Sequence, residues 1–228
     1  MCIRDSKLTV PASILFTTFV VVVIVNSFNL IDGVDGLAGM LGSISAFTFG
    51  VISYLMYQPQ IAIFSFIISG SLLAFLLYNL HPAKLFMGDT GSLFIGMALS
   101  IMALNIIRNG LVVEGFRDLQ LPNKGPLIAI ALLAIPLFDS LRVFLYRFLN
   151  KRHPLHAGRD HFHHILLDLG YGHARTSFLI LLLSIFSIFL AYNLLDVNIN
   201  LSIFILALFN YTFIFIFSIL RGRKRRRK

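Results

Sequence analysis

Four polar side chains follow one another at three-residue intervals in the stretch NSFNLIDGVDGLAG, residues 26–39, directly after an apolar segment. They are Asn26, Asn29, Asp32 and Asp35. Residues three apart lie on one face of a helix, so the spacing predicts a single polar ridge at the end of a membrane span. Two carboxylates and two amides could hold a cation there, whereas a carboxylate at the bilayer centre would cost about 2.5–3.5 kcal/mol. A polar loop that only caps two helices is the plainer alternative.

A second polar stretch, NLHPAKLFMGDTGS, covers residues 79–92 and places Asp89 between Gly88 and Gly91. Mg²⁺ prefers oxygen ligands, keeps several waters and often uses only one or two protein carboxylates. We therefore predict that Asp89 and a member of the first ridge bind Mg²⁺, with Mn²⁺ as the other candidate ion. Lys84 could offset phosphate charge and Phe86 could offer its ring to a base. A lysine that only sets topology and an ordinary apolar contact explain these two residues equally well.

The third stretch is rich in histidine, with six of the seven histidines of the chain between residues 153 and 173. Among them His161, His163 and His164 form an HxHH pattern just after Arg159. Imidazoles beside a phosphate can donate hydrogen bonds or transfer protons, and an arginine can bind phosphate through two parallel hydrogen bonds. A zinc cluster is the rival interpretation, although there is no cysteine partner and the spacing does not match HExxH. Surface histidines without a role are the third alternative.

Membrane-spanning helices must position these stretches, because the chain of 228 residues is 57% hydrophobic and only 13% charged. A window of about 20 residues predicts an all-α polytopic membrane protein with about seven transmembrane helices. The predicted segments are Val10–Val25, Leu37–Tyr57, Ile61–Leu80, Ser92–Ile107, Pro126–Phe148, Thr176–Leu195 and Ile199–Leu220. Pro136 and Asp139 interrupt the fifth segment. We expect one transmembrane domain over residues 10–220, preceded by an extracytoplasmic start, residues 1–9, of a truncated gene model.

Basic residues indicate which side of the membrane each loop faces. The connection between Arg147 and Arg175 is rich in arginine and lysine, and seven of the eight residues of the tail, 221–228, are basic, so both should be cytoplasmic. Counting backward through the predicted spans puts all three polar stretches on this same face. Three separate motifs thereby become one candidate site. A basic run after a last span ordinarily binds anionic lipid, and nucleic acid is the less favoured partner.

The stretches NSFNLIDGVDGLAG, NLHPAKLFMGDTGSLFIG and HAGRDHFHHILLDLG resemble, in this order, those of the polyprenyl-phosphate N-acetylhexosamine-1-phosphate transferases. That family includes the WecA, TagO and MraY enzymes, and the HxHH form makes the chain more similar to the WecA and TagO branch. The resemblance implies a Mg²⁺-dependent enzyme of the bacterial plasma membrane with its active site on the cytoplasmic face. Such an enzyme moves sugar 1-phosphate, here GlcNAc 1-phosphate by preference, from a UDP-sugar to undecaprenyl phosphate. The products are UMP and a lipid-linked pyrophosphate sugar for cell-envelope polysaccharide synthesis.

The resemblance also implies a role for each candidate residue. Asp89 would be the main Mg²⁺ ligand, Phe86 would stack on uracil, and the three histidines would contact the pyrophosphate. The predicted catalytic group is Asp32, Asp35, His161, His163 and His164, and the predicted substrate-binding group is Asn26, Asn29, Lys84, Phe86 and Arg159. Phosphoryl transfer needs positioning and charge neutralisation more than covalent help, and this set of residues offers both.

One departure from the family leaves alternatives open. The family carries an adjacent Asp pair on a more amino-terminal cytoplasmic loop, and no such pair precedes Asn26. We expect the upstream genomic sequence to supply it with further spans, in which case this polypeptide alone is inactive. A non-catalytic polyprenyl-phosphate-binding protein and an ion-coupled transporter are the rival classes, although within the spans only Asp139 and Arg142 offer charges to a transporter. A homodimer is compatible with the sequence.

Overall fold

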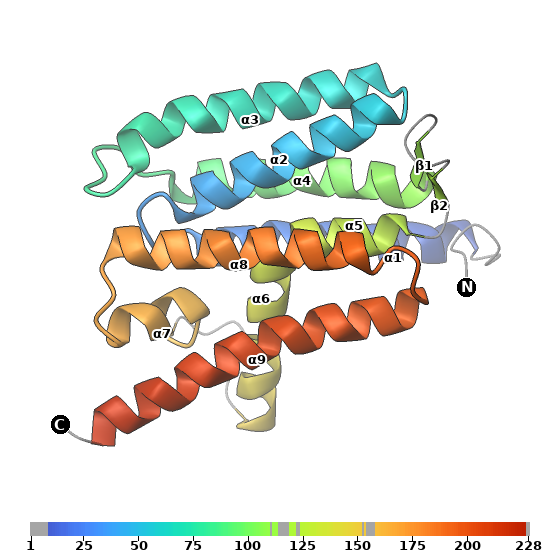
Figure 1. Cartoon of the computed structure of the whole chain (residues 1–228). Coiled ribbons are helices and arrows are strands. Elements are labelled where there is room, and N and C mark those ends of the chain that lie inside the picture. Colours follow the sequence, from blue (N-terminus) through green and yellow to red (C-terminus); the bar gives the residue numbers. More distant parts are fainter. Residues whose placement is uncertain are drawn as a thin grey trace.

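The computed structural model describes residues 9–109, 111–113, 119–121, 124–151, 153 and 158–226, most of them helical. The elements in chain order are α1 (Val10–Ile31), α2 (Leu37–Leu55), α3 (Pro59–Asn79), α4 (Gly88–Asn109), β1 (Leu111–Val113), β2 (Leu119–Leu121), α5 (Gly125–Leu132), α6 (Ala134–Leu149), α7 (Phe162–Asp168), α8 (His173–Asn193) and α9 (Ile199–Arg226), as Figure 1 shows. Six of these helices are long and apolar enough to cross a membrane, and α5 with α6 makes a seventh candidate. The predicted all-α polytopic membrane fold is confirmed, with one short antiparallel strand pair added.

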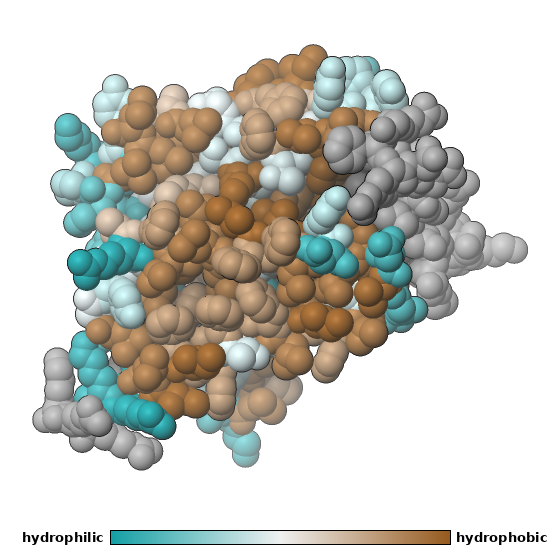
Figure 2. Space-filling model, in the orientation of Figure 1, coloured by the Kyte–Doolittle hydropathy of each residue, from teal (hydrophilic) through white to brown (hydrophobic). Residues whose placement is uncertain are grey.

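Large apolar side chains cover the outside of the bundle, and small polar ones lie inside it. On α3, Leu73 and Leu77 are exposed while Ser65 and Ser69 are buried. Figure 2 shows a broad apolar surface with hydrophilic side chains gathered toward its two ends. Lipid tails are as apolar as leucine, so helices in a membrane associate through close packing and small residues rather than by hiding apolar surface. The distribution is therefore that of a bundle surrounded by lipid.

Close helix contacts depend on glycine and serine. A methyl group at Gly50 of α2 would lie 2.8 Å from the ring of Phe66 on α3. The hydroxyl of Ser69 on α3 donates to the carbonyl of Ser43 on α2, at 3.1 Å. On α4, a methyl at Gly96 would lie 2.8 Å from the Cα of Val25, so the backbones of α1 and α4 nearly touch. This last approach brings the polar ends of α1 and α4 side by side.

The fifth predicted segment, Pro126–Phe148, is two helices rather than one, with a bend of 79° between α5 and α6. Pro136 explains the break, because it has no N–H to donate to the carbonyl of Leu132 four residues earlier. The hydroxyl of Ser45 on α2 donates to that carbonyl instead, at 2.7 Å. The bend turns α6 away from α5, and Figure 1 shows α6 leaving the bundle beneath α8.

Several predicted boundaries are wrong in ways that matter for the site. The first span continues past Val25 to Ile31, and the fourth begins at Gly88 rather than Ser92, so Asp89 lies in the first turn of α4. Helix α7 was not predicted, because at seven residues it is too short for a hydropathy window. Residues 1–8 of the predicted amino-terminal start and the last two residues of the predicted tail lie outside the described residues.

Three connections meet at one end of the bundle: the α1–α2 turn, the α3–α4 loop, and the segment that carries α7. The N–H of Gly36 donates to the Asn79 side-chain oxygen at 3.0 Å, and Asp35 contacts both His81 and His173. The end of α9 lies at this same end, where the Lys224 ammonium donates to the carbonyl of Leu169. Figure 1 shows this end on the left. The prediction that the three polar stretches share one face is confirmed, and its cytoplasmic orientation stays a prediction.

Candidate functional site

A pair of carboxylates, Asp32 and Asp89, lies where α1 ends and α4 begins. The side-chain amide of Asn29 donates to a carboxylate oxygen of Asp89 at 3.1 Å and to the hydroxyl of Ser92 at 2.8 Å. Burial, and then the negative charge of Asp89, raise the pKa of Asp32 against the hydrogen bond that the Gly88 N–H donates to it. The negative charges of Asp32 and Asp89 repel each other, so a cation between the two carboxylates would stabilise both of them. Carboxylate, amide and hydroxyl oxygens are the donors that Mg²⁺ prefers, so these residues fit that ion.

The predicted four-residue ridge is wrong beyond Asn29. Helix α1 ends at Ile31, and Asp32 already has non-helical dihedrals of φ −76° and ψ 55°. Asp35 lies past this turn, whereas Asn26 is exposed on the helix and donates to its own helix at the carbonyl of Val22. The three-residue spacing therefore places only the two asparagines on a common helix. The substrate-binding role predicted for Asn26 stays a prediction.

Asp35 joins a different group, which links all three connections. Its carboxylate oxygens lie 2.7 Å from Nδ1 of His81 and 3.3 Å from Nδ1 of His173, and the two imidazole rings stack with centroids 5.4 Å apart. The N–H of Ala83 also donates to Asp35, at 3.3 Å. Burial alone would raise the pKa of Asp35, but the His81 hydrogen bond, the Ala83 N–H and the charge of His173 lower it on balance. The ionised form of Asp35 thus holds the α1–α2 turn to the other two connections.

The Asp35, His81 and His173 ligand atoms all lie within 4.8 Å of one another, which is close enough for a divalent metal ion. Two imidazoles and one carboxylate suit transition metals rather than Mg²⁺. We did not anticipate this grouping, because His81 and His173 are 92 positions apart in the sequence. Nothing local to either histidine indicates it.

Asp139 on α6 holds the start of the histidine stretch. Its carboxylate is buried and lies 3.0 Å from Nδ1 of His161 and 2.7 Å from the Arg142 guanidinium. The N–H of Phe162 donates to both of its oxygens at 3.1 Å, so a carboxylate from another helix satisfies the amino terminus of α7. Asp139 and Arg142, the two charged residues that the sequence places within the spans, thus form an ion pair with each other. The role of Asp139 in placing His161 was missed, and the available signal was a carboxylate inside an apolar segment.

His163 and His164 are neutral at pH 7. Burial, and then the charge of His164, lower the pKa of His163 to about 3, although Asp139 opposes them. Burial and the Arg159 guanidinium lower the pKa of His164. Both Nδ1 atoms are buried without a hydrogen-bond partner among the described residues. These side chains can therefore donate or accept hydrogen bonds, and they bring no positive charge to a phosphate.

Helix α7 contacts the α1–α2 turn at Gly33. A methyl group at Gly33 would lie 2.7 Å from Nε2 of His163, which is closer than two such atoms normally approach. Only a glycine leaves room for this contact. The ring of His163 in turn lies 5.8 Å from that of His161 and 4.2 Å from that of His164. The first and third predicted stretches are thus in direct contact, as one shared site requires.

The remaining predicted substrate-binding residues are exposed at the surface. Lys84 is exposed, and the ring of Phe86 is 74% exposed and therefore open to a stacking partner. Arg159 is exposed and pairs with Asp168 at 3.1 Å, so it would have to exchange this partner to bind a phosphate. The substrate-binding roles of Lys84, Phe86 and Arg159 stay predictions.

Together, the fold and this site define a multi-pass membrane protein with an acidic and histidine-rich site at one end of its helices. Residues 2–107 match the family model described as glycosyl transferase family 4. The match includes the α1–α2 turn and Asp89, and it ends before Asp139 and the histidine stretch. Residues 2–107 are thus similar in sequence to glycosyl transferase family 4.

Individual relatives agree with this match. The chain is 37% identical over 125 residues to a probable undecaprenyl-phosphate N-acetylglucosaminyl 1-phosphate transferase of Bacillus subtilis, over 54% of this chain and 32% of the relative. It is 36% identical over 131 residues to a decaprenyl-phosphate N-acetylglucosaminephosphotransferase of Mycolicibacterium smegmatis, over 56% of this chain and 31% of the relative. A phospho-N-acetylmuramoyl-pentapeptide-transferase of Listeria monocytogenes is 45% identical over 65 residues, which cover 28% of this chain and 20% of the relative.

The matched region spans about a third of the length of the first two relatives. The resemblance inferred from the three motifs, to the polyprenyl-phosphate N-acetylhexosamine-1-phosphate transferases, is confirmed.

Proposed function

We propose that this chain transfers N-acetylhexosamine 1-phosphate, by preference GlcNAc 1-phosphate, from a UDP-sugar to undecaprenyl phosphate or a similar polyprenyl phosphate. The observation that carries the proposal is the carboxylate pair of Asp32 and Asp89, which Asn29 orients at the end of a membrane span. A water-soluble nucleotide and a membrane lipid can both reach that level. The relatives named as GlcNAc 1-phosphate transferases support the same choice of sugar and acceptor.

The chain's own residues divide the work between charge and position. Asp32 and Asp89 would hold Mg²⁺, or Mn²⁺ in its place, and the ion would neutralise charge on the phosphate oxygens. Asn29 fixes the orientation of the Asp89 carboxylate at the proposed ion site through its hydrogen bond at 3.1 Å. The exposed ring of Phe86 offers a stacking surface to the uracil base.

The histidine stretch would bind phosphate oxygens by hydrogen bonds. His163 and His164 are neutral at pH 7, so each ring can donate through one nitrogen. Asp139 is a positioning residue, because it acts through His161 and the start of α7. Asp35 is also a positioning residue, because its contacts with His81 and His173 hold the three connections together.

The proposed site would face the cytoplasm of a bacterial cell, where UDP-sugars are made. Its support is that the basic end of α9 lies at the same end of the bundle as the site, as the Lys224 contact with Leu169 indicates. Every residue invoked comes from one chain, so the proposal holds equally for a monomer and for the homodimer that the sequence allows.

The test uses the purified chain in detergent micelles with radiolabelled UDP-GlcNAc, undecaprenyl phosphate and MgCl₂. We expect UDP-GlcNAc binding that EDTA abolishes, a readout that does not require turnover. Asp89→Asn should weaken Mg²⁺-dependent nucleotide binding at least about 100-fold. Mutating a residue that only hydrogen-bonds to a metal ligand already lowers metal affinity about 10-fold to 100-fold. Asp196→Asn, an exposed carboxylate between α8 and α9, is the matched control. Nucleotide binding that is absent, or indifferent to both EDTA and Asp89→Asn, would contradict the proposal.

A further inference from the structure

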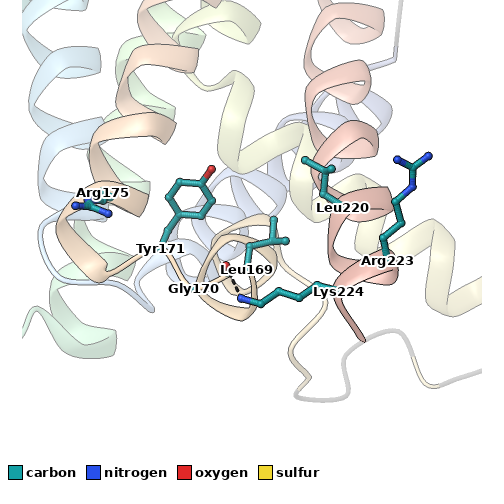
Figure 3. A pocket seen from close by; sticks show the side chains of 7 residues that line it. All are labelled: Leu169, Gly170, Tyr171, Arg175, Leu220, Arg223 and Lys224. Carbon is teal, nitrogen blue, oxygen red and sulfur yellow. Dashed lines mark hydrogen bonds between the residues drawn. The ribbon is translucent and has the colours of Figure 1, made fainter. Parts of the chain in front are cut away.

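A separate pocket of about 480 Å³ lies between the turn that follows α7 and the carboxyl-terminal turns of α9. Figure 3 shows its walls, with Arg175 on one side and Arg223 on the other. Tyr171 and Leu220 supply apolar surface between them. None of the residues assigned above to the carboxylate pair or the histidine stretch lines this pocket. It is therefore a second candidate binding site at the same end of the bundle.

The pocket is strongly basic. Its lining includes Arg175, Arg223 and Lys224 and no carboxylate. Within the part of the chain that the structure describes, neither Arg175 nor Arg223 makes an ion pair or a side-chain hydrogen bond. The carboxylate of Asp168, the last residue of α7, forms ion pairs with Arg159 at 3.1 Å and with Arg221 at 3.6 Å. The two guanidinium groups in the pocket thus have donors available for an anion.

One wall of the pocket is built in a definite way. The Lys224 ammonium donates to the carbonyl of Leu169 at 2.6 Å, a bond drawn in Figure 3. The next residue, Gly170, has φ +95°, and a methyl group there would lie 3.1 Å from the Lys224 nitrogen. This backbone conformation and this close approach both favour glycine. Lys224 thereby ties the end of α9 to the turn after α7 and forms this wall of the pocket.

The level of the pocket in the membrane, at the ends of two candidate spans, indicates the class of ligand. Arg223 and Lys224 end the candidate span Ile199–Lys224, and Arg175 lies in the first turn of the candidate span His173–Asn193. All three cations therefore lie where the hydrocarbon layer ends and the lipid phosphates begin. The exposed side chain of Leu220, one turn deeper on α9, would adjoin the first carbons of an acyl chain. We propose that this pocket binds the phosphate headgroup of an anionic glycerophospholipid from the surrounding leaflet.

A single-tryptophan reporter tests the proposal, because the chain has no tryptophan of its own. Leu220→Trp replaces an exposed apolar side chain at the pocket. The full chain is reconstituted in vesicles of unlabelled phosphatidylcholine with a small fraction of either phosphatidylglycerol or phosphatidylcholine carrying brominated acyl chains. We expect brominated phosphatidylglycerol to quench the reporter at a lower mole fraction than brominated phosphatidylcholine.

Charge variants separate a pocket from general attraction to a basic surface. Arg175→Gln and Arg223→Gln should each lower the preference for phosphatidylglycerol about fivefold, which corresponds to about 1 kcal/mol per basic residue at the membrane surface. Lys151→Gln, an exposed lysine just after α6, removes the same charge outside the pocket and is the matched control. Arg223→Lys keeps the charge and should keep the preference, which distinguishes a lost contact from a misfolded protein.

Three outcomes would overturn the proposal. The first is equal quenching by the two brominated lipids, and the second is a Lys151→Gln effect as large as that of the pocket variants. The third is displacement of brominated phosphatidylglycerol by inorganic phosphate, or by equimolar undecaprenyl phosphate, as readily as by unlabelled phosphatidylglycerol. No readout depends on sugar transfer, so the result is independent of the proposed function.

Discussion

Asp139→Asn should destabilise the protein more than any exposed carboxylate change, because Asp139 has three partners and is buried. It accepts from His161, from Arg142 and from the N–H of Phe162. Asparagine has nearly the same volume but no charge, and it turns one acceptor into a donor that faces other donors. Breaking a buried ion pair costs about 3–5 kcal/mol. The Arg142 side chain is 24% exposed and can gain water, so we expect the lower end, about 3 kcal/mol.

The free energy of unfolding is measured by denaturant titration in detergent micelles. Asp196→Asn is the control, and this exposed change should stay within about 0.5 kcal/mol of the unchanged protein. His161→Gln and the double variant complete a double-mutant cycle, which should show a coupling of at least about 1 kcal/mol between residues 139 and 161. An Asp139→Asn cost below about 0.5 kcal/mol, or additive effects in the cycle, would refute the claim that this carboxylate anchors the histidine stretch.

Three further predictions concern the site and its orientation. Gly33→Ala places a methyl 2.7 Å from Nε2 of His163 and should cost about 1–3 kcal/mol in unfolding titrations, a cost that shrinks when His163 is also alanine. A persistent cost would show that the two residues are not in contact. The folded pKa of His163, about 3, lies below the ordinary 6.5, so the unfolded chain binds a proton that the folded chain refuses between these values. Stability should therefore fall as pH drops from 6.5 toward 3, by up to about 5 kcal/mol, and His163→Gln should flatten this slope; an unchanged slope would contradict it. A reporter fused after Lys228 should give a cytoplasmic signal, and a periplasmic signal would overturn the orientation argument.

The spans, the shared end of the polar stretches and the break in the fifth segment could be predicted from sequence, because each depends on local properties of the chain. Hydropathy over about 20 residues finds spans because each span must satisfy its own backbone hydrogen bonds in lipid. The parity of the spans then placed the three polar stretches at one end, and the contact of Gly33 with His163 agrees. Pro136 marked the interruption of the fifth segment, since a missing N–H is a property of one residue.

Other predictions failed where a local pattern competes with packing. The spacing from Asn26 to Asp35 fits a helix, but the chain leaves α1 after Ile31 and turns at glycines, with φ +75° at Gly36. Asp89 was expected in a loop and lies in a helix turn, because hydropathy cannot register a polar first turn as part of a span.

By itself, the sequence determined the membrane class, the approximate positions of six spans, their polar ends and the resemblance to sugar 1-phosphate transferases. Only the tertiary structure decided that Asn29 orients Asp89, that Asp35 joins His81 to His173, and that Asp139 holds the histidine stretch. The physical reason is that composition and period act within one helix. Which side chains meet at its end depends on close packing between helices far apart in the chain, at contacts such as Gly96 against α1, and on the bend between α5 and α6.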